Sequence, residues 1–183
     1  MKYGVMLNLS EEGQEHIQRL RSLIIPNNNM RIIRQPAHIS IAFVEELKMG
    51  DMKFAEEMEK FAHEIGQIPV KLSSLGVFDN AKKTIFMGAE KSQALVDANY
   101  NFYNYVTGGF MAQGYCIPGK FTPHVSLAKT HADMDTTKVI RQLEEAGAVP
   151  FDAIANRLTI RFDNKSDMDF ARFDLKPKGG RTQ

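Results

Sequence analysis

The apolar residues of this chain occur in short runs of two kinds, one with a period of two and one with helical spacing. The run from residue 2 to residue 9 alternates between faces, which predicts a β-strand. Ile17, Leu20 and Ile24 instead share one face of a helix that follows Ser10. By the same criteria, further strands are expected over residues 38–44, 68–78, 84–89, 124–127, 151–162 and 168–175, and further helices over residues 51–65, 91–107 and 135–146.

Two of the expected strands carry the same short motif, each a little after a proline. The first copy is His38-Ile39-Ser40-Ile41 and the second is His124-Val125-Ser126-Leu127. Residues two apart in a strand point to the same face, so each copy presents an imidazole beside a hydroxyl. Two such pairs at one site would suit acid–base chemistry on a phosphate ester. The motif alone is short, and a strand with a polar face toward water has the same pattern.

The elements that follow the two motifs occur in the same order. Each motif is followed by a helix that starts at an aspartate and ends at a glycine, and then by two long strands. The two copies are about 86 residues apart, which indicates an internal repeat. We therefore expect an α+β fold of two pseudo-symmetric lobes, each with a mainly antiparallel sheet and packed helices, around a central groove. His38 and His124 would then face each other across that groove.

Length and composition limit the remaining possibilities. The chain has 183 residues and a net charge of +1, which predicts a single domain over residues 1–176 and a disordered tail over 177–183. The single cysteine, Cys116, rules out an internal disulfide and fits a reducing compartment. No run is long enough to span a membrane, and the N-terminus lacks the features of a signal peptide. We expect a soluble cytoplasmic protein.

Acidic residues are missing around both motifs, although they are common elsewhere. Residues 16–44 and 98–132 contain no Asp or Glu, and such surroundings favour an anionic ligand. The cations nearest the motifs are Arg34, Lys120 and Lys129, which are candidates to pair with phosphate; solvated surface cations are the alternative.

Three aromatic residues lie near the motifs and could either stack on a nucleobase or pack in the core. Tyr115 and Phe121 are candidates to stack on a nucleobase, with packing as the alternative. Phe43 should belong to the core, because simple alternation places it opposite the face of His38.

Two other kinds of site are disfavoured. Residues 114–120 fit most of the phosphate-binding pattern G-x-x-x-x-G-K-[ST], but Phe121 replaces the hydroxyl residue, and a strand follows where that loop requires a helix. There is no cysteine pair and no histidine pair at the helical spacing of zinc ligands. We expect no metal and no cofactor.

The two motifs, their spacing and the repeat resemble the 2H phosphoesterase superfamily, which includes 2′-5′ RNA ligase-like proteins and cyclic phosphodiesterases. That family has two His-x-Thr/Ser motifs, each followed by an apolar residue, and both copies here match with serine in place of the commoner threonine. The resemblance covers nearly the whole chain and is greatest to a small bacterial branch of phosphoesterases.

The resemblance implies a function and roles for four residues. The function would be metal-independent hydrolysis of a cyclic or 2′-5′ phosphodiester of a nucleotide or RNA end, with RNA ligation as a further activity. His38 would be the proton donor and His124 the proton acceptor, while Ser40 and Ser126 would bind the phosphate oxygens. The alternative is a binding module that holds a nucleotide or RNA end in the same groove without turnover. No protein partner is implied.

Overall fold

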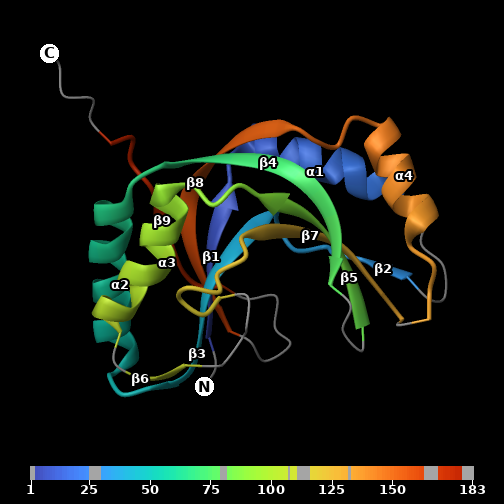
Figure 1. Ribbon diagram of the computed structural model, residues 1–183. Helices are drawn as coiled ribbons and strands as arrows, with labels where there is room; N and C mark the ends of the chain where they lie inside the picture. Colours follow the sequence, from blue (N-terminus) through green and yellow to red (C-terminus); the bar gives the residue numbers. More distant parts are fainter. Residues whose placement is uncertain are drawn as a thin grey trace, which may run out of the picture.

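A computed structural model describes residues 3–24, 30–78, 82–106, 108–110, 116–131, 133–162 and 169–178 (Figure 1). Within these ranges lie four helices and nine strands. In chain order they are β1 (Tyr3–Leu9), α1 (Glu11–Leu23), β2 (Met30–Ile32), β3 (His38–Leu47), α2 (Asp51–Ile65), β4 (Ile68–Phe78), β5 (Lys82–Ala89), α3 (Gln93–Tyr105), β6 (Gly108–Phe110), β7 (His124–His131), α4 (Thr137–Glu145), β8 (Phe151–Phe162) and β9 (Asp169–Asp174).

The strands form one antiparallel sheet in the order β2-β7-β5-β4-β8-β1-β3-β6, with β9 paired to β8. This order is symmetric about the central β4–β8 pair, because β5 occupies the position of β1, β7 that of β3, and β2 that of β6. The repeat therefore runs β1-α1-β2-β3-α2-β4 and then β5-α3-β6-β7-α4-β8. The predicted α+β fold is confirmed, and the sheets of the two halves join through β4 and β8.

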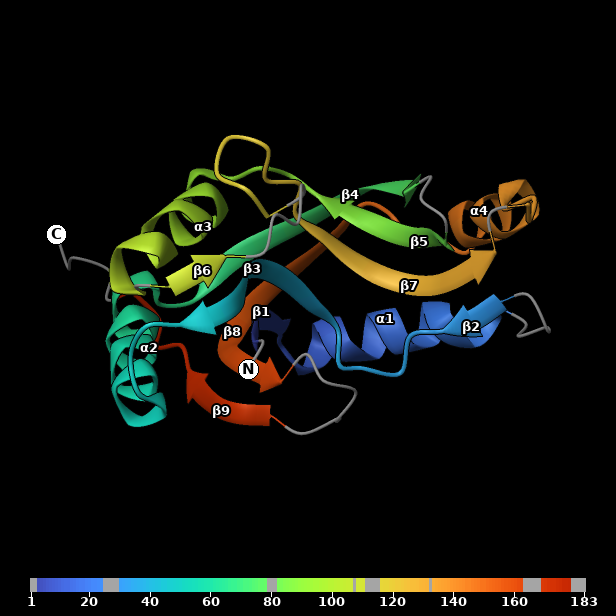
Figure 2. The same cartoon turned by 90° about the horizontal axis from the view of Figure 1, so that it is seen from below.

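The curvature of the sheet brings the two motif strands together. The helices α2 and α3 pack at one end of the molecule, and α1 and α4 pack at the other (Figure 1). Four strands separate β3 from β7 in the sheet order, yet the two contact each other (Figure 2). Each half also lends a short strand to the other, since β2 pairs with β7 and β6 pairs with β3.

The apolar faces predicted from the sequence form the core. On α1 the buried side chains include Ile17 and Leu20, and on α2 they include Phe54, Met58 and Phe61. The residues that alternate with the motif polar groups are fully buried: Ile39, Ile41, Val125 and Leu127. This packing turns the histidine and serine side chains of both strands away from the core.

Some local expectations need correction. Asp51 does not cap α2: Gly50 is the N-cap, and the Asp51 carboxylate accepts a hydrogen bond from the hydroxyl of Tyr3 at 3.0 Å. The strands β2 and β6 were not predicted, because three residues are too few to show a period. Pro177 and Lys178 lie in the described chain, whereas the rest of the predicted tail, residues 179–183, lies outside it. No helix in the described ranges is long and apolar enough to cross a membrane.

The burial of β8 predicts how two isoleucines of one strand contribute to stability. Ile160 is fully buried, whereas Ile154 is 44% exposed. We expect Ile160→Ala to lower the free energy of unfolding by about 2–5 kcal/mol, because it leaves a cavity in the core. Ile154→Ala, the same change on the same strand, should cost less than about 1 kcal/mol. Urea denaturation of both variants measures the difference, and equal losses would contradict the described packing.

Candidate active site

The structure places the two histidines at equivalent positions, each at the start of its strand, and these strands contact each other without pairing in the sheet. His38 begins β3 and faces Asn8 of β1 across the ladder, and His124 begins β7 and faces Gly88 of β5. The charge of His124 is close enough to lower the pKa of His38. Ser40 and Ser126 follow on the same faces and are half-buried. The four predicted motif side chains therefore lie on two neighbouring strands.

Both imidazoles are held by the same kind of hydrogen bond. Nδ1 of His38 lies 2.7 Å from the carbonyl oxygen of Pro36, and Nδ1 of His124 lies 2.9 Å from the carbonyl oxygen of Thr122. A carbonyl can only accept, so Nδ1 carries the hydrogen in both rings. In the neutral ring, Nε2 is then the nitrogen whose lone pair can take a proton. The two histidines therefore share one tautomer.

Each motif strand contains a β-bulge directly after its serine. The β1–β3 register slips so that Ile41 has no partner, and the β5–β7 register slips so that Leu127 has none. A bulge shifts the alternation by one residue. Phe43 is therefore half-buried on the face of His38, and its predicted place in the core is wrong. The same shift puts Lys129 on the face of His124, where it is exposed.

A buried arginine connects the two motif segments. Arg21 of α1 is 4% exposed; its Nη1 donates to the carbonyl of Gln35 at 2.7 Å and its Nη2 to the carbonyl of Ser126 at 2.9 Å. Its Nε has no hydrogen-bond partner, and burial lowers the pKa of the guanidinium to about 10. Among the described residues no carboxylate pairs with it. Arg21 thus places an uncompensated positive charge beside both motifs.

The other half of the molecule has an equivalent arrangement built from neutral groups. Nδ2 of Asn99 on α3 donates to the carbonyls of Ile41 at 2.8 Å and of Cys116 at 2.7 Å. The thiol of Cys116 in turn donates to the carbonyl of Ser40 at 3.3 Å. Burial raises the pKa of Cys116 to about 12, so this sulfur remains a thiol and does not act as a nucleophile. Asn99 and Cys116 therefore position the first motif as Arg21 positions the second.

The surroundings of His38 disfavour its charged form. Burial is the largest cause, and the next causes that lower the pKa of His38 are the charges of Arg161 and Arg21. Together they bring the pKa of His38 to about 4. Arg161 is 6% exposed; its Nε donates to the Asp169 carboxylate at 2.7 Å, and Arg172 donates to the same carboxylate at 2.6 Å. Two arginines thus share one carboxylate, and a net positive charge remains near His38.

The surroundings of His124 are aromatic instead. The rings of Phe78 and Phe86 stack with centroids 4.2 Å apart, and both contact His124 edge-on, at 4.7 and 5.4 Å. Burial lowers the pKa of His124. A Cβ on Gly76 would lie 2.5 Å from the Phe86 ring, so only glycine leaves room for this ring. The pattern of the sequence did not single out Phe78 or Phe86, because both lie far from the motifs along the chain.

The remaining predicted residues have different locations. Arg34 and Lys120 are exposed. Phe121 is 3% exposed and packs in the core, so its ring offers no face to a nucleobase. Tyr115 lies outside the described residues. Within the described ranges no group of three or more His, Cys, Asp or Glu side chains could hold a metal ion.

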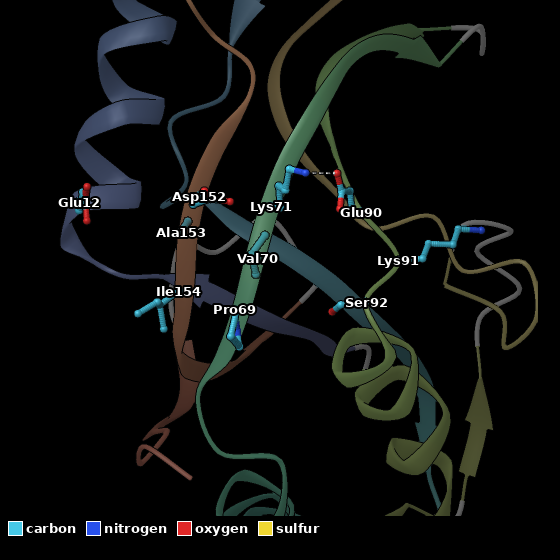
Figure 3. A pocket seen from close by; sticks show the side chains of 10 residues that line it. All are labelled: Glu12, Pro69, Val70, Lys71, Glu90, Lys91, Ser92, Asp152, Ala153 and Ile154. Atoms are coloured by element: carbon cyan, nitrogen blue, oxygen red, sulfur yellow. Dashed lines mark ion pairs between the residues drawn. The ribbon is translucent and has the colours of Figure 1, made fainter. Parts of the chain in front are cut away.

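A pocket of about 700 Å³ lies away from the motifs (Figure 3). Its walls come from α1, β4, β8 and the segment between β5 and α3, and the ion pair between Lys71 and Glu90 at 2.8 Å crosses one side of it. No motif residue lines this pocket. The candidate active site is therefore the surface between β3 and β7 and not this pocket.

Burial and, to a smaller extent, the charges of Arg161 and Arg21 predict how the His38 ring titrates. We expect NMR to show the His38 ring titrating near pH 4 in the ligand-free protein, below its ordinary value of 6.5. Arg21→Met removes one repelling charge and should raise the pKa of His38. Arg21→Lys keeps the charge and is the matched control, in which the pKa should stay low. An unchanged pKa in Arg21→Met would show that this charge does not act on His38.

Comparison with known proteins places this chain in a family. A model of the 2′-5′ RNA ligase superfamily matches residues 9–163. No curated protein matches the chain.

Several solved structures share the fold at low sequence identity. The protein TT0787 of Thermus thermophilus has a TM-score of 0.63 and 14% identity, over 98% of this chain and 100% of that one. E. coli LigT complexed with 3′-AMP has a TM-score of 0.61 and 14% identity, over 96% and 98%. Kluyveromyces marxianus Usb1 with uridine monophosphate has a TM-score of 0.56 and 14% identity, over 96% and 98%. Since the family model covers most of the chain and the fold agrees, this protein belongs to the 2′-5′ RNA ligase superfamily, a group of 2H phosphoesterases.

Proposed function

We propose that this protein is a metal-independent phosphoesterase that hydrolyses a cyclic or 2′-5′ phosphodiester of a nucleotide or RNA end. The observation that carries the proposal is the equivalent placement of His38 and His124, each with a serine two residues on and each fixed through Nδ1. Two imidazoles of this kind can serve as acid and base on opposite sides of one phosphorus.

The electrostatics of the site support an anionic substrate. Arg21 is buried without a carboxylate partner among the described residues, and Arg161 shares Asp169 with Arg172. Burying an unpaired charge costs several kcal/mol, on the order of what a bound phosphate could offset. Related structures contain nucleotides, 3′-AMP in E. coli LigT and uridine monophosphate in Usb1. A nucleotide phosphate between β3 and β7 would supply the missing negative charge.

The proposed reaction divides the work among four side chains. Water attacks the phosphorus, Nε2 of His124 takes its proton, and Nε2 of His38 gives a proton to the leaving oxygen. Ser40 and Ser126 donate hydrogen bonds to the non-bridging oxygens, where charge increases in the transition state. The low pKa of His38 in the empty site means that it must gain its proton together with the substrate, because a phosphate raises the pKa of a nearby imidazole.

Loss of either histidine should abolish most of the activity. We expect His38→Ala and His124→Ala each to lower kcat/KM for a 2′,3′-cyclic nucleotide by about 10²–10⁴-fold. EDTA should leave the wild-type rate unchanged. His63→Ala, at an exposed site on α2, is the matched control and should keep full activity.

Two outcomes of this assay would count against the proposal. A wild-type protein that binds the cyclic nucleotide without turnover would instead be a binding module. A rate that disappears with EDTA would point to a metal-dependent mechanism.

The acid and base roles can be separated with a leaving group that needs no proton. Replacing the leaving alcohol by 4-nitrophenol makes the general acid dispensable. We therefore expect His38→Ala to lose at least about tenfold less activity on a nucleoside 4-nitrophenyl phosphate than on the cyclic nucleotide. His124→Ala should lose the same factor on both substrates. The opposite pattern would exchange the two roles.

A further inference from the structure

A second pocket is lined by two residues that neighbour His38, Asn8 and Pro36. It has a volume of about 520 Å³ and is lined by Asn8, Pro36, Arg157 and Thr159, among others. Asn8 is the cross-strand neighbour of His38, and the carbonyl of Pro36 accepts the hydrogen bond from its Nδ1. Directly opposed residues of an antiparallel pair have Cβ atoms about 5 Å apart. His38 itself does not line the pocket, which includes these two neighbours of its ring and continues over β1 and β8.

The two arginines of this pocket are already paired, and Glu11 adds a carboxylate to its lining. Arg157 donates to Asp174 at 2.9 Å, and Arg172 donates to Asp169 at 2.6 Å. The pocket therefore offers no unpaired arginine to a second phosphate. This separates it from the surface between the motif strands, where Arg21 lacks a carboxylate partner among the described residues.

Three neutral side chains of the pocket still have hydrogen-bonding capacity, whereas the Gln14 amide is engaged with Leu9 and Ala37. Oδ1 of Asn8 has no hydrogen-bond partner, and it can turn toward a ligand without breaking a bond of its own. Within the described chain, the side chains of Asn156 and Thr159 also make no hydrogen bond. Three neutral polar groups beside paired arginines and the acceptor carboxylate of Glu11 fit an uncharged polar ligand that carries several donors. The hydroxyls of a ribose and the edge of a nucleobase have this chemistry.

We propose that this pocket binds the nucleoside that leaves when the phosphodiester is cleaved. The inference rests on the proposed function, with His38 as the proton donor. In an in-line reaction the leaving oxygen lies at the acid, on the far side of the phosphorus from the base. The group attached to that oxygen then extends beyond His38, away from His124 and over Asn8. A cyclic mononucleotide has no such group, so it would leave the pocket empty.

The step balances without any further reactant. The oxygen of water forms a bond to phosphorus, and the bond from phosphorus to the leaving nucleoside oxygen breaks with its electron pair on that oxygen. His38 gives its proton to this oxygen, and His124 takes the proton of the water. The products are a nucleoside 2′-phosphate and a free nucleoside, which the pocket releases.

The test compares substrates that share a phosphate and differ in the leaving group. The substrates are a 2′-5′-linked dinucleotide, the methyl ester of the nucleoside 2′-phosphate, and a 2′,3′-cyclic nucleotide. The first two both release a primary alcohol, so a difference between them reports the nucleoside alone. We expect wild type to cleave the dinucleotide with a kcat/KM at least about tenfold above that of the methyl ester.

Asn8→Ala should remove part of this preference. We expect it to lower kcat/KM for the dinucleotide by about five- to tenfold, the effect of one neutral hydrogen bond, and to leave the cyclic nucleotide unchanged. Asn156→Ala, on another wall of the pocket, should act in the same way and decides the matter if Asn8→Ala does not fold. Asn104→Ala, at an exposed position of α3, is the matched control and should change neither rate.

The outcomes separate the two proposals. If wild type hydrolyses the cyclic nucleotide but treats the dinucleotide and the methyl ester alike, the proposed function stands and the pocket is not a nucleoside subsite. If Asn8→Ala slows all three substrates equally, Asn8 acts by positioning His38, and the subsite is again refuted. If wild type turns over none of them, the proposed function fails and the subsite fails with it.

Discussion

The geometry of the site depends on how the chain satisfies backbone carbonyls at two β-bulges. A bulge interrupts the ladder, and a buried carbonyl without a donor costs about 1–3 kcal/mol. After the second motif the donor is Arg21, and after the first motif the donors are Asn99 and Cys116. Each donor comes from the opposite half of the repeat, and Arg21 and Asn99 also bind the segment that precedes the other motif. The same contacts that satisfy the bulges therefore hold the two motif strands together.

Arginine at one of these positions has an electrostatic consequence that a neutral donor would not have. In one half, the neutral amide of Asn99 donates the hydrogen bonds that the buried carbonyls need. In the other half, Arg21 donates these hydrogen bonds and adds a positive charge that no carboxylate among the described residues balances. Burial is the main cause of the low pKa of His38, and this charge lowers it further and makes the empty site unfavourable. A phosphate would relieve both effects, so the packing of the backbone and the affinity for an anion have one origin.

The sequence was sufficient for the frame of this fold and insufficient for the contacts that tune the site. Period-two alternation and helical spacing gave the long strands and all four helices, because burial of one face leaves a direct mark on the sequence. Simple alternation failed at Phe43, because a bulge changes the phase and depends on the partner strand. The acid-free segment around the first motif included Arg21, but its role requires a carbonyl of Ser126, 105 residues away along the chain. Asn8, Phe78 and Phe86 were missed for the same reason, since only the folded sheet brings them to the histidines.

The backbone is symmetric, but the side chains around the two histidines differ. Two-histidine catalysis requires such a difference. Equal tautomers and equal bulges give both rings the same orientation relative to their strands. Acid and base must nevertheless differ in protonation, which only their surroundings can impose. Burial is the largest cause of the low pKa of His38, and the charges of Arg161 and Arg21 add to it, so the proton affinity of His38 rises when an anion arrives. The Phe78 and Phe86 rings act on His124 mainly by excluding water, an effect that a bound phosphate does not cancel. The repeated backbone thus carries two histidines with different surroundings. His38 responds to the substrate charge, and His124 remains neutral and able to accept a proton.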